Sequence, residues 1–204
     1  MEQYQGIKFN VRFLNERVLD YPIQKELIEW GKKLSKLGCI PTYPNPENPG
    51  IISSAGNLSA RIGDRFIITA AGSNLGELSN NNFVEVWDVD MSEKLIQAKG
   101  SEEPSSETML HYSIYQKRND VQVIFHGHNQ QLLAQCSQLG LKSTKKWYPY
   151  GTLELMNSVC DMIKENDRFL IMKDHGFLSF GKTCQQAGEN IIQVLSKVEK
   201  IKEI

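Results

Sequence analysis

The sequence predicts one α/β domain of three layers, α/β/α, over residues 1–204, with a hairpin-rich and largely antiparallel central sheet. The length of 204 residues suits one large domain, since domains average about 150 residues. Apolar residues recur at helical spacing near both ends and in the middle of the chain. The segments between them alternate with period two and are separated by turn signals. Helices around such a sheet indicate layers on its faces, and the hairpins argue against an all-parallel, doubly wound sheet.

The composition is typical of a globular protein outside the membrane. Hydrophobic residues make up 40% and charged residues 23% of the chain, and no apolar run reaches the roughly 18 residues of a membrane span. The first ten residues contain no apolar run of signal-peptide type. A net charge of -1 provides no basic field for a nucleic-acid backbone. We therefore expect a cytoplasmic protein that binds neither nucleic acid nor membrane.

The cysteines support the same compartment. They stand far apart and form no CxxC pair, at Cys39, Cys136, Cys160 and Cys184. This spacing indicates neither a disulfide framework nor a zinc ribbon, and it fits a reducing cytoplasm.

The first part of the chain is predicted to hold a helix, a loop and two strands. Apolar residues spaced by four and three indicate a helix over 23–37, which Gly38 can cap. Four prolines in 41–50 exclude a helix or a central strand, so this segment is expected to be a surface loop. Alternating apolar residues predict strands over 57–62 and 65–69, joined by a tight turn.

The rest of the chain is predicted to alternate between strands and helices. The expected elements, in order, are strands over 83–89 and 94–98, a helix after Pro104 through Lys117, a strand over 121–126, helices over 130–138 and 152–165, strands over 168–173 and 177–180, and a last helix from about 183 to the end. Thr152 is suited to cap the helix that it opens.

Three of the four histidines stand at predicted strand ends. His126 and His128 are two residues apart, so their imidazoles point to the same face. His175 follows another apolar strand, between Asp174 and Gly176. Three imidazoles that leave one open position are a common arrangement for a catalytic divalent metal, most often zinc. The alternative is that three histidines lie near strand ends by chance.

The helix after Pro104 carries two further residues of interest. Glu107 and His111 are four apart and share a helix face, and we expect His111 to be a packed structural residue. Glu107 follows Ser105 and Ser106 at the helix start, where hydroxyls and free N–H groups suit an anion. In the alternative interpretation, Glu107 only favours the helix dipole.

Four segments, in this order and at this spacing, resemble the class II aldolase/adducin family. They are GNLSAR (56–61), ITAAG (68–72), PSSETMLHYSIYQKRNDVQVIFHGH (104–128) and IMKDHGFLSFGKT (171–183). The enzymes they resemble most are the L-fuculose-phosphate and related sugar-phosphate aldolases. The resemblance implies the family's fold in one domain over 1–204, and a divalent-metal-dependent aldolase that cleaves a small ketose phosphate.

The resemblance also implies roles for single residues. His126, His128 and His175 match the family's metal-binding histidines. Glu107 matches the acidic residue that serves as acid/base and can approach the metal, which would be Zn²⁺ or another divalent ion. Five residues match the positions that hold the substrate phosphate, namely Gly56, Asn57, Gly72, Ser105 and Ser106.

Two features depart from the family pattern. Ala71, in the phosphate-binding turn, stands where the aldolases commonly have Thr or Ser. The segment between His128 and Tyr150 is shorter than in a typical aldolase, where it holds a tyrosine that donates a proton across the subunit boundary. Tyr148 and Tyr150 are the nearest candidates for that tyrosine. The resemblance further implies a homotetramer with each site at a subunit interface.

The residues suit aldol chemistry in their own right. Retro-aldol cleavage leaves an enediolate, whose negative charge a divalent ion can stabilise without a Schiff-base lysine. A carboxylate near the metal can move the proton on the enediolate carbon, provided that partial burial raises its pKa.

Other functions remain open at this point. Family members that resemble this chain include a methylthioribulose-phosphate dehydratase, 4-epimerases and a sugar-acid phosphate decarboxylase. The epimerases typically have Asp at the position of Glu107. A different class of function is a non-enzymatic interaction domain of the adducin type, in which the metal residues are lost.

Overall fold

The computed structural model describes residues 8–16, 20–45 and 48–202. Residues 1–7, considered above for a leader sequence, lie outside the described part, as do residues 46–47 of the proline-rich segment. Within the described ranges, no helix combines the length and the apolar character needed to cross a membrane.

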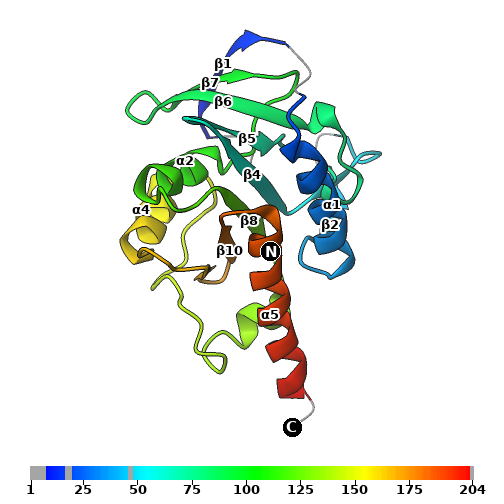
Figure 1. The fold of residues 1–204 in the computed structure, drawn as a ribbon, viewed down its shortest axis with the longest axis vertical. Coiled ribbons are helices and arrows are strands. Elements are labelled where there is room, and N and C mark those ends of the chain that lie inside the picture. The colour runs from blue at the N-terminus through cyan, green and yellow to red at the C-terminus, as the bar shows by residue number, and fades with distance from the viewer. Residues whose placement is uncertain (1–7, 17–19, 46–47, 203–204) are drawn as a thin grey trace.

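An eight-stranded sheet occupies the centre of the molecule (Figure 1). Its order from edge to edge is β1-β7-β6-β5-β4-β8-β10-β9. The strands are β1 Asn10–Asn15, β4 Gly56–Ile62, β5 Arg65–Thr69, β6 Phe83–Asp90, β7 Leu95–Lys99, β8 Val123–Gly127, β9 Phe169–Met172 and β10 Gly176–Gly181. Neighbouring strands run antiparallel except for β1 and β7, which are parallel. The expectation of a largely antiparallel sheet is thus confirmed, with one parallel pair that the sequence did not predict.

Strand β1 was missed because it is an exposed edge strand. Five of its six residues are exposed, so no apolar face marks it in the sequence. Its position comes from pairing with β7, from Asn10 opposite Leu95 to Asn15 opposite Lys99. Backbone pairing of this kind leaves little trace in a hydrophobic pattern.

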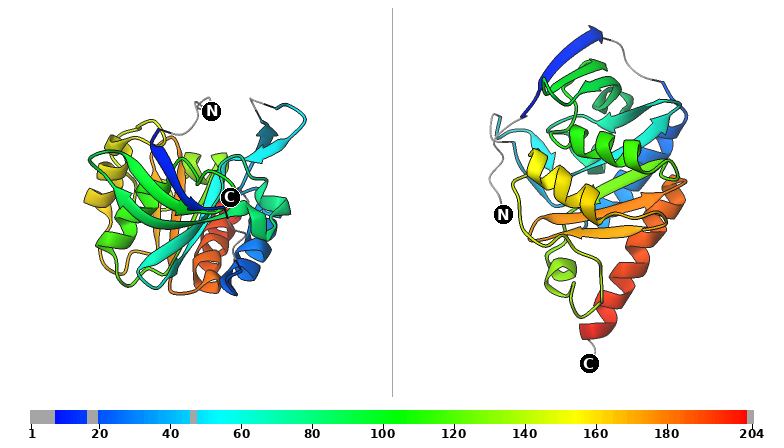
Figure 2. Two further views of the ribbon diagram at one scale, coloured as in Figure 1. Left: turned by 90° about the horizontal axis from the view of Figure 1, so that it is seen from above. Right: turned by 90° about the vertical axis from the view of Figure 1, so that its left-hand side faces the viewer.

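Helices cover both faces of the sheet, which gives three layers (Figures 1 and 2). The helices are α1 Ile23–Lys36, α2 Thr108–Lys117, α3 Gln130–Ala134, α4 Leu153–Met162 and α5 Cys184–Lys202, with short 3-10 turns at Leu75–Glu77 and Asn80–Asn82. Helices α1 and α5 pack with one apolar cluster on one face, and α2 and α4 with a second cluster on the other face. The hydrophobic core is therefore divided in two by the sheet.

The predicted first helix is confirmed, and its apolar stripe is buried. Leu27, Trp30 and Leu34 of α1 are all at most 6% exposed, and Gly38 follows with a φ of +67°, which suits glycine. Trp30 lies directly on Gly188 of α5, where an added Cβ would be 2.1 Å from the indole ring. The two helices on this face therefore pack in close contact.

The structure differs from the predicted elements at several places. The proline-rich segment forms no helix and no central strand, as expected, but it contains the short strands β2 Thr42–Pro44 and β3 Ile52–Ser54, which pair with each other in a separate sheet. Helix α3 ends at Ala134 and α4 at Met162, earlier than predicted. The expected N-cap is confirmed, since the Thr152 hydroxyl accepts a hydrogen bond from the Leu155 N–H.

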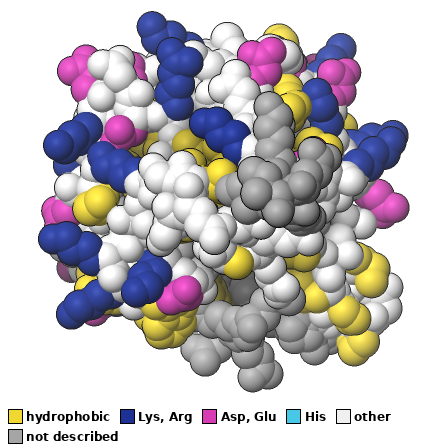
Figure 3. All heavy atoms as spheres, turned by 90° about the horizontal axis from the view of Figure 1, so that it is seen from below, with side chains coloured by type: hydrophobic (Ala, Val, Ile, Leu, Met, Phe, Trp, Pro, Cys, Tyr) yellow, Lys and Arg dark blue, Asp and Glu magenta, His cyan; other side chains and the backbone are white. Residues whose placement is uncertain are grey.

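The surface is mixed in charge. On the face in Figure 3, basic and acidic side chains lie interspersed, with hydrophobic side chains in small groups between them. This distribution agrees with the net charge of -1.

Candidate active site

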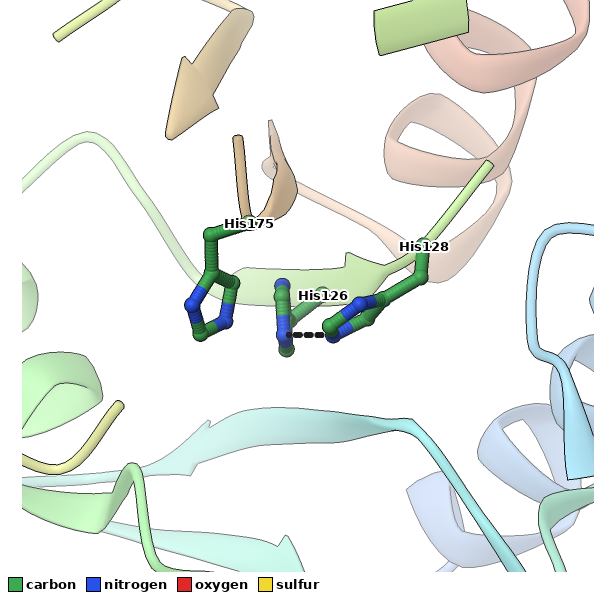
Figure 4. Close-up of side chains that lie close together, drawn as sticks. All are labelled: His126, His128 and His175. Carbon is green, nitrogen blue, oxygen red and sulfur yellow. Dashed lines mark hydrogen bonds between the residues drawn. The ribbon is translucent and has the colours of Figure 1, made fainter. Parts of the chain in front are cut away.

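Three imidazoles converge at one end of β8 (Figure 4). His126 is on β8, His128 directly follows that strand, and His175 is in the turn between β9 and β10. The pairing of β8 with β10 places His126 opposite Leu178, which brings the turn to the end of β8. One nitrogen from each ring lies within 4.8 Å of the others, and Nε2 of His126 is 3.0 Å from Nε2 of His128. The structure thus brings together the three histidines that the sequence singled out.

The backbone fixes the orientation of the central imidazole. Nδ1 of His126 lies 2.9 Å from the carbonyl oxygen of Phe177. A carbonyl can only accept, so Nδ1 carries the proton and donates it. In the neutral ring Nε2 then keeps its lone pair and faces the other two histidines. This arrangement is typical of metal-ligating histidines, whose second nitrogen is held by a neighbouring group.

Glu107 adds a carboxylate to the cluster. Its Oε2 is 3.0 Å from Nε2 of His126, and its Oε1 is 3.3 Å from Nε2 of His175. Asn57 donates from Nδ2 to the same Oε2 over 3.0 Å. Glu107 stands at the N-cap of α2 but makes no capping bond with its side chain. The helix-dipole interpretation therefore does not account for where the carboxylate points.

The expected pKa of Glu107 is corrected by the structure. Burial would raise it, but the imidazoles of His126 and His175, through charge and hydrogen bonds, lower the pKa of Glu107 well below its usual value. In turn, Glu107 raises the pKa of His126 against the effect of burial. The sequence indicated only the effect of burial, because it did not show two imidazoles in contact with the carboxylate.

The donor set fits a divalent cation. Tetrahedral zinc with metal–nitrogen bonds of 2.0–2.1 Å separates two nitrogen ligands by about 3.3 Å, close to the 3.0 Å between His126 and His128. Oε1 of Glu107 is buried, and no donor within the described residues makes a hydrogen bond of good geometry to it, although Nε2 of His175 lies 3.3 Å away. A cation nearby would stabilise this oxygen, since a buried carboxylate oxygen without a well-formed hydrogen bond is costly.

The polar residues assigned to phosphate lie around the same cavity. It has a volume of about 980 Å³, and besides the histidines and Glu107 it is lined by Gly56, Asn57, Ala71, Gly72, Ser105 and Ser106. An isolated bridge between Ala70 and Pro104 joins the two turns that carry most of these residues. The backbone N–H of Ala71 donates to the carbonyl of Glu103, and that of Ser105 donates to the carbonyl of Thr69.

Glycine at position 56 is required by the local geometry. Its φ is +135°, and a Cβ there would lie 2.6 Å from the carbonyl oxygen of His126. The pairing of β4 with β8 places Asn57 opposite His126. Close approach of the two strands at Gly56 therefore sets the position of Asn57 beside the histidines.

Sequence reasoning missed some of the cavity wall. Tyr43 of β2 lines the cavity, and its pKa is raised by burial and by the nearby Tyr150. The only sequence feature that could have indicated Tyr43 was an aromatic side chain within the proline-rich segment. Of the two tyrosines considered earlier, Tyr150 lines the cavity, whereas Tyr148 packs against the cluster of α2 and α4.

His111 lies beneath the site and is not one of the clustered ligands. It is 0% exposed, and burial lowers the pKa of His111 to about 3, so the ring is neutral. Its Nδ1 lies 2.8 Å from the Ser59 hydroxyl. The interpretation of His111 as a packed helix residue agrees with this position.

A family profile described as "Class II Aldolase and Adducin N-terminal domain" matches residues 51–199. The chain belongs to the class II aldolase and adducin family. Members of this family typically depend on a divalent metal.

Relatives within the class II aldolase and adducin family carry two different names. An L-fuculose phosphate aldolase of Methanocaldococcus jannaschii is 30% identical over 167 residues, which is 75% of this chain and 83% of the relative. A methylthioribulose-1-phosphate dehydratase of Pseudoalteromonas translucida is 34% identical over 104 residues, which is 51% of this chain and 42% of the relative. A solved L-fuculose 1-phosphate aldolase superposes with a TM-score of 0.68 at 22% identity, over 90% of this chain and 86% of that one. The superposition shows that the α/β fold is that of class II aldolases.

Proposed function

We propose that this chain is a divalent-metal-dependent aldolase that cleaves a small ketose phosphate. The observation that carries the proposal is the convergence of three imidazoles and the Glu107 carboxylate in one cavity of about 980 Å³. A class II aldolase-like relative at 30% identity supports the same reaction class. The adducin-type alternative, in which these residues are lost, has no support from this arrangement.

The metal would be held by His126, His128 and His175, with Glu107 close enough to join them. When bound, a divalent ion such as Zn²⁺ supplies positive charge that stabilises the negative charge developing on substrate oxygens. The chain itself contributes the orientation of these ligands. Phe177 fixes the tautomer of His126, and Asn57 holds Glu107.

Glu107 would move the proton of the cleavage reaction. The neighbouring imidazoles lower the pKa of Glu107 and so favour its ionised form. In that form it would accept the proton of the substrate carbon in the condensation direction, and in its protonated form it would deliver that proton to the enediolate carbon in the cleavage direction. The hydrogen bond from Asn57 keeps one carboxylate oxygen in place during this transfer. A group held in this way can act as a general base without first reorganising.

The substrate phosphate would be held by neutral donors. Among the described residues lining the cavity, none is Lys or Arg. The hydroxyls of Ser105 and Ser106, the side-chain amide of Asn57 and the backbone N–H groups at Gly56 and Gly72 would therefore bind the phosphate, whereas Ala71 lines the cavity with its own N–H already bonded to Glu103. Ala71 offers no hydroxyl, which leaves Ser105 and Ser106 as the hydroxyl donors of this set.

We also propose the wider setting of the enzyme. Residues 1–204 would form one domain of a cytoplasmic homotetramer with sites at the subunit interfaces. Of the two tyrosine candidates for proton donation, Tyr150 lines the cavity of its own chain, so it would serve this site from within the subunit and not across the boundary.

A dehydratase acting on methylthioribulose 1-phosphate is the second candidate. It is favoured by relatives of that name, including one at 34% identity over half of this chain. Both reactions would use the same metal ligands and Glu107, so the products distinguish them.

The test is product analysis on a panel of ketose phosphates. Purified protein is incubated with L-fuculose 1-phosphate, other ketose 1-phosphates and methylthioribulose 1-phosphate, with and without added Zn²⁺. Carbon–carbon cleavage to two fragments supports the aldolase, and loss of water without cleavage supports the dehydratase. If no member of the panel is converted in the presence of metal, the sugar-phosphate proposal is wrong.

A further inference from the structure

Helix α2 and strand β4 meet along a line of polar side chains next to the candidate metal centre. We call this set the polar seam, and its members are Asn57, Ser59 and Arg61 from β4 and Glu107, His111 and Tyr115 from the helix side. Two residues along a strand rise about 6.7 Å and four residues along a helix rise about 6.0 Å. Because these two spacings nearly match, each polar side chain of the strand meets one of the helix.

Hydrogen bonds connect the two sides of the seam. Asn57 donates to Glu107 over 3.0 Å. The Ser59 hydroxyl lies 2.8 Å from Nδ1 of His111 and 2.7 Å from the hydroxyl oxygen of Tyr115. Ser59 and His111 are each 0% exposed. The middle of the seam is therefore closed to solvent, and its hydrogen bonds run only within the protein.

The far end of the seam is held by Arg61. Its guanidinium lies over the Tyr115 ring at 4.7 Å and donates to the Tyr115 carbonyl. It also donates from Nε to the carbonyl of Val121 over 2.9 Å. Tyr115 is thus fixed both at its ring and at its backbone.

The opposite face of β4 shows that polar side chains are not needed to pack a helix against this strand. Leu58 and Ala60 point to the other side of β4 and pack in the apolar cluster of α1 and α5. Burying polar groups costs free energy that apolar side chains do not incur. Hydrogen bonds differ from apolar contacts in being directional, so they fix the rotation and register of a helix.

We propose that Ser59, His111 and Tyr115 are positioning residues for Glu107, an inference that rests on the proposed function. Glu107 directly precedes the first residue of α2. A small rotation or shift of the helix would therefore carry its carboxylate away from His126. The bonds of Ser59 to His111 and Tyr115 lie on the helix face that Glu107 shares, one and two turns further along the helix, and they prevent such movement.

The test removes single atoms of the seam in the full chain. Tyr115→Phe takes away one oxygen and leaves the ring under Arg61, and Ser59→Ala takes away the central hydroxyl. For each variant we measure kcat, KM, the thermal midpoint and Zn²⁺ affinity by competition with a chromogenic chelator. We expect kcat and Zn²⁺ affinity to fall by about 10- to 100-fold, as for other groups that orient metal ligands. KM should change less than about twofold, since the phosphate donors are untouched.

A matched control is available on another strand. Ser179 of β10 is also 0% exposed, and its hydroxyl donates to the Ala187 carbonyl of α5 over 2.6 Å. Ser179→Ala should lower the thermal midpoint as Ser59→Ala does, with kcat and Zn²⁺ affinity within about twofold of wild type, because this bond lies outside the cavity wall.

Two substitutions at position 111 sharpen the test. The amide of Asn reaches the place of Nδ1 and can bond Ser59, whereas the amide of Gln reaches the place of Nε2. His111→Asn should therefore keep more of the kcat than His111→Gln. If His111 only stabilised the fold, His111→Asn would not keep more of the kcat than His111→Gln.

The proposal is overturned if Tyr115→Phe and Ser59→Ala lower the thermal midpoint but leave kcat and Zn²⁺ affinity as the Ser179→Ala control does. Should Ser59→Ala fail to fold, Tyr115→Phe decides, since it removes only one atom. If wild type converts no ketose phosphate, the proposed function is wrong, and the positioning proposal is tested by Zn²⁺ affinity alone. Unchanged Zn²⁺ affinity in Ser59→Ala and Tyr115→Phe then overturns the positioning proposal.

Discussion

Oε2 of Glu107 lies 3.0 Å from Nε2 of His126, and the two residues come from different elements, the start of α2 and strand β8. Asn57, opposite His126 in the pairing of β4 with β8, donates to the same carboxylate oxygen. The carboxylate is thus held between a strand amide and an imidazole. It faces the cavity instead of capping its own helix.

Replacing the Glu107 carboxylate by an amide distinguishes a catalytic role of this residue from a role in stability alone. Glu107→Gln keeps the size of the side chain but removes the base, so kcat should fall by about 10²–10⁴-fold. If Glu107 only favoured the helix dipole, the change would cost about 0.3–1 kcal/mol of unfolding free energy and leave turnover intact. Measuring kcat and the thermal midpoint on one sample distinguishes the two. Wild-type turnover with a lowered midpoint would reject the catalytic assignment.

Gly176 offers a test of the histidine geometry without touching a histidine. A Cβ at this position would lie 2.7 Å from Cε1 of His126 and 2.6 Å from the Gly127 carbonyl oxygen. Gly176→Ala should therefore displace the His126 ring and weaken Zn²⁺ binding by at least about tenfold, with an overpacking cost of about 1–3 kcal/mol. Gly50→Ala, where the added Cβ meets only an ordinary contact at 3.5 Å, is the control. Zn²⁺ affinity equal in the two variants would contradict the described packing.

Arg118 is expected to stabilise the fold without affecting the chemistry. Its side chain is 4% exposed, and the guanidinium donates to both carboxylate oxygens of Asp120 at 2.7 Å and to the carbonyls of Lys164 and Asp167. Arg118→Met should lower the free energy of unfolding by about 3 kcal/mol, the lower end for a broken buried pair, since Asp120 is partly exposed.

The more exposed ion pair of Lys142 with Asp167 provides the comparison for Arg118. Lys142→Met should cost at most about 1 kcal/mol. Chemical denaturation measures both variants, and kcat at a temperature well below both midpoints should be unchanged. An equal cost for the two substitutions would show that the Arg118 network is not the stronger one.

Much of the fold was predictable because hydrophobic spacing determines it. The stripe of α1 gave its length to within one residue, from 23–37 predicted to Ile23–Lys36. Strand β1 gave no such signal because its side chains are mostly exposed. The end of α3 at Ala134 could not be predicted from hydrophobic spacing either, since helix ends depend on local capping and tertiary contacts.

The site was predictable in its residues but not in its electrostatics. Spacing alone placed His126 and His128 on one face, and the third imidazole needed the pairing of β8 with β10 to bring the turn alongside. The lowered pKa of Glu107 depends on two contacts between residues far apart in the chain. No sequence pattern contains such contacts.

Zn²⁺ titration of metal-stripped wild-type protein tests the central claim most directly. Protein purified without a histidine tag and stripped with a chelator should take up one Zn²⁺ per chain. His126→Ala and His175→Ala should lose this uptake while keeping the circular dichroism spectrum of wild type, because the sheet core does not depend on the ion. Absence of any uptake by wild type, or global unfolding of either variant, would contradict the account and mark the histidines as structural.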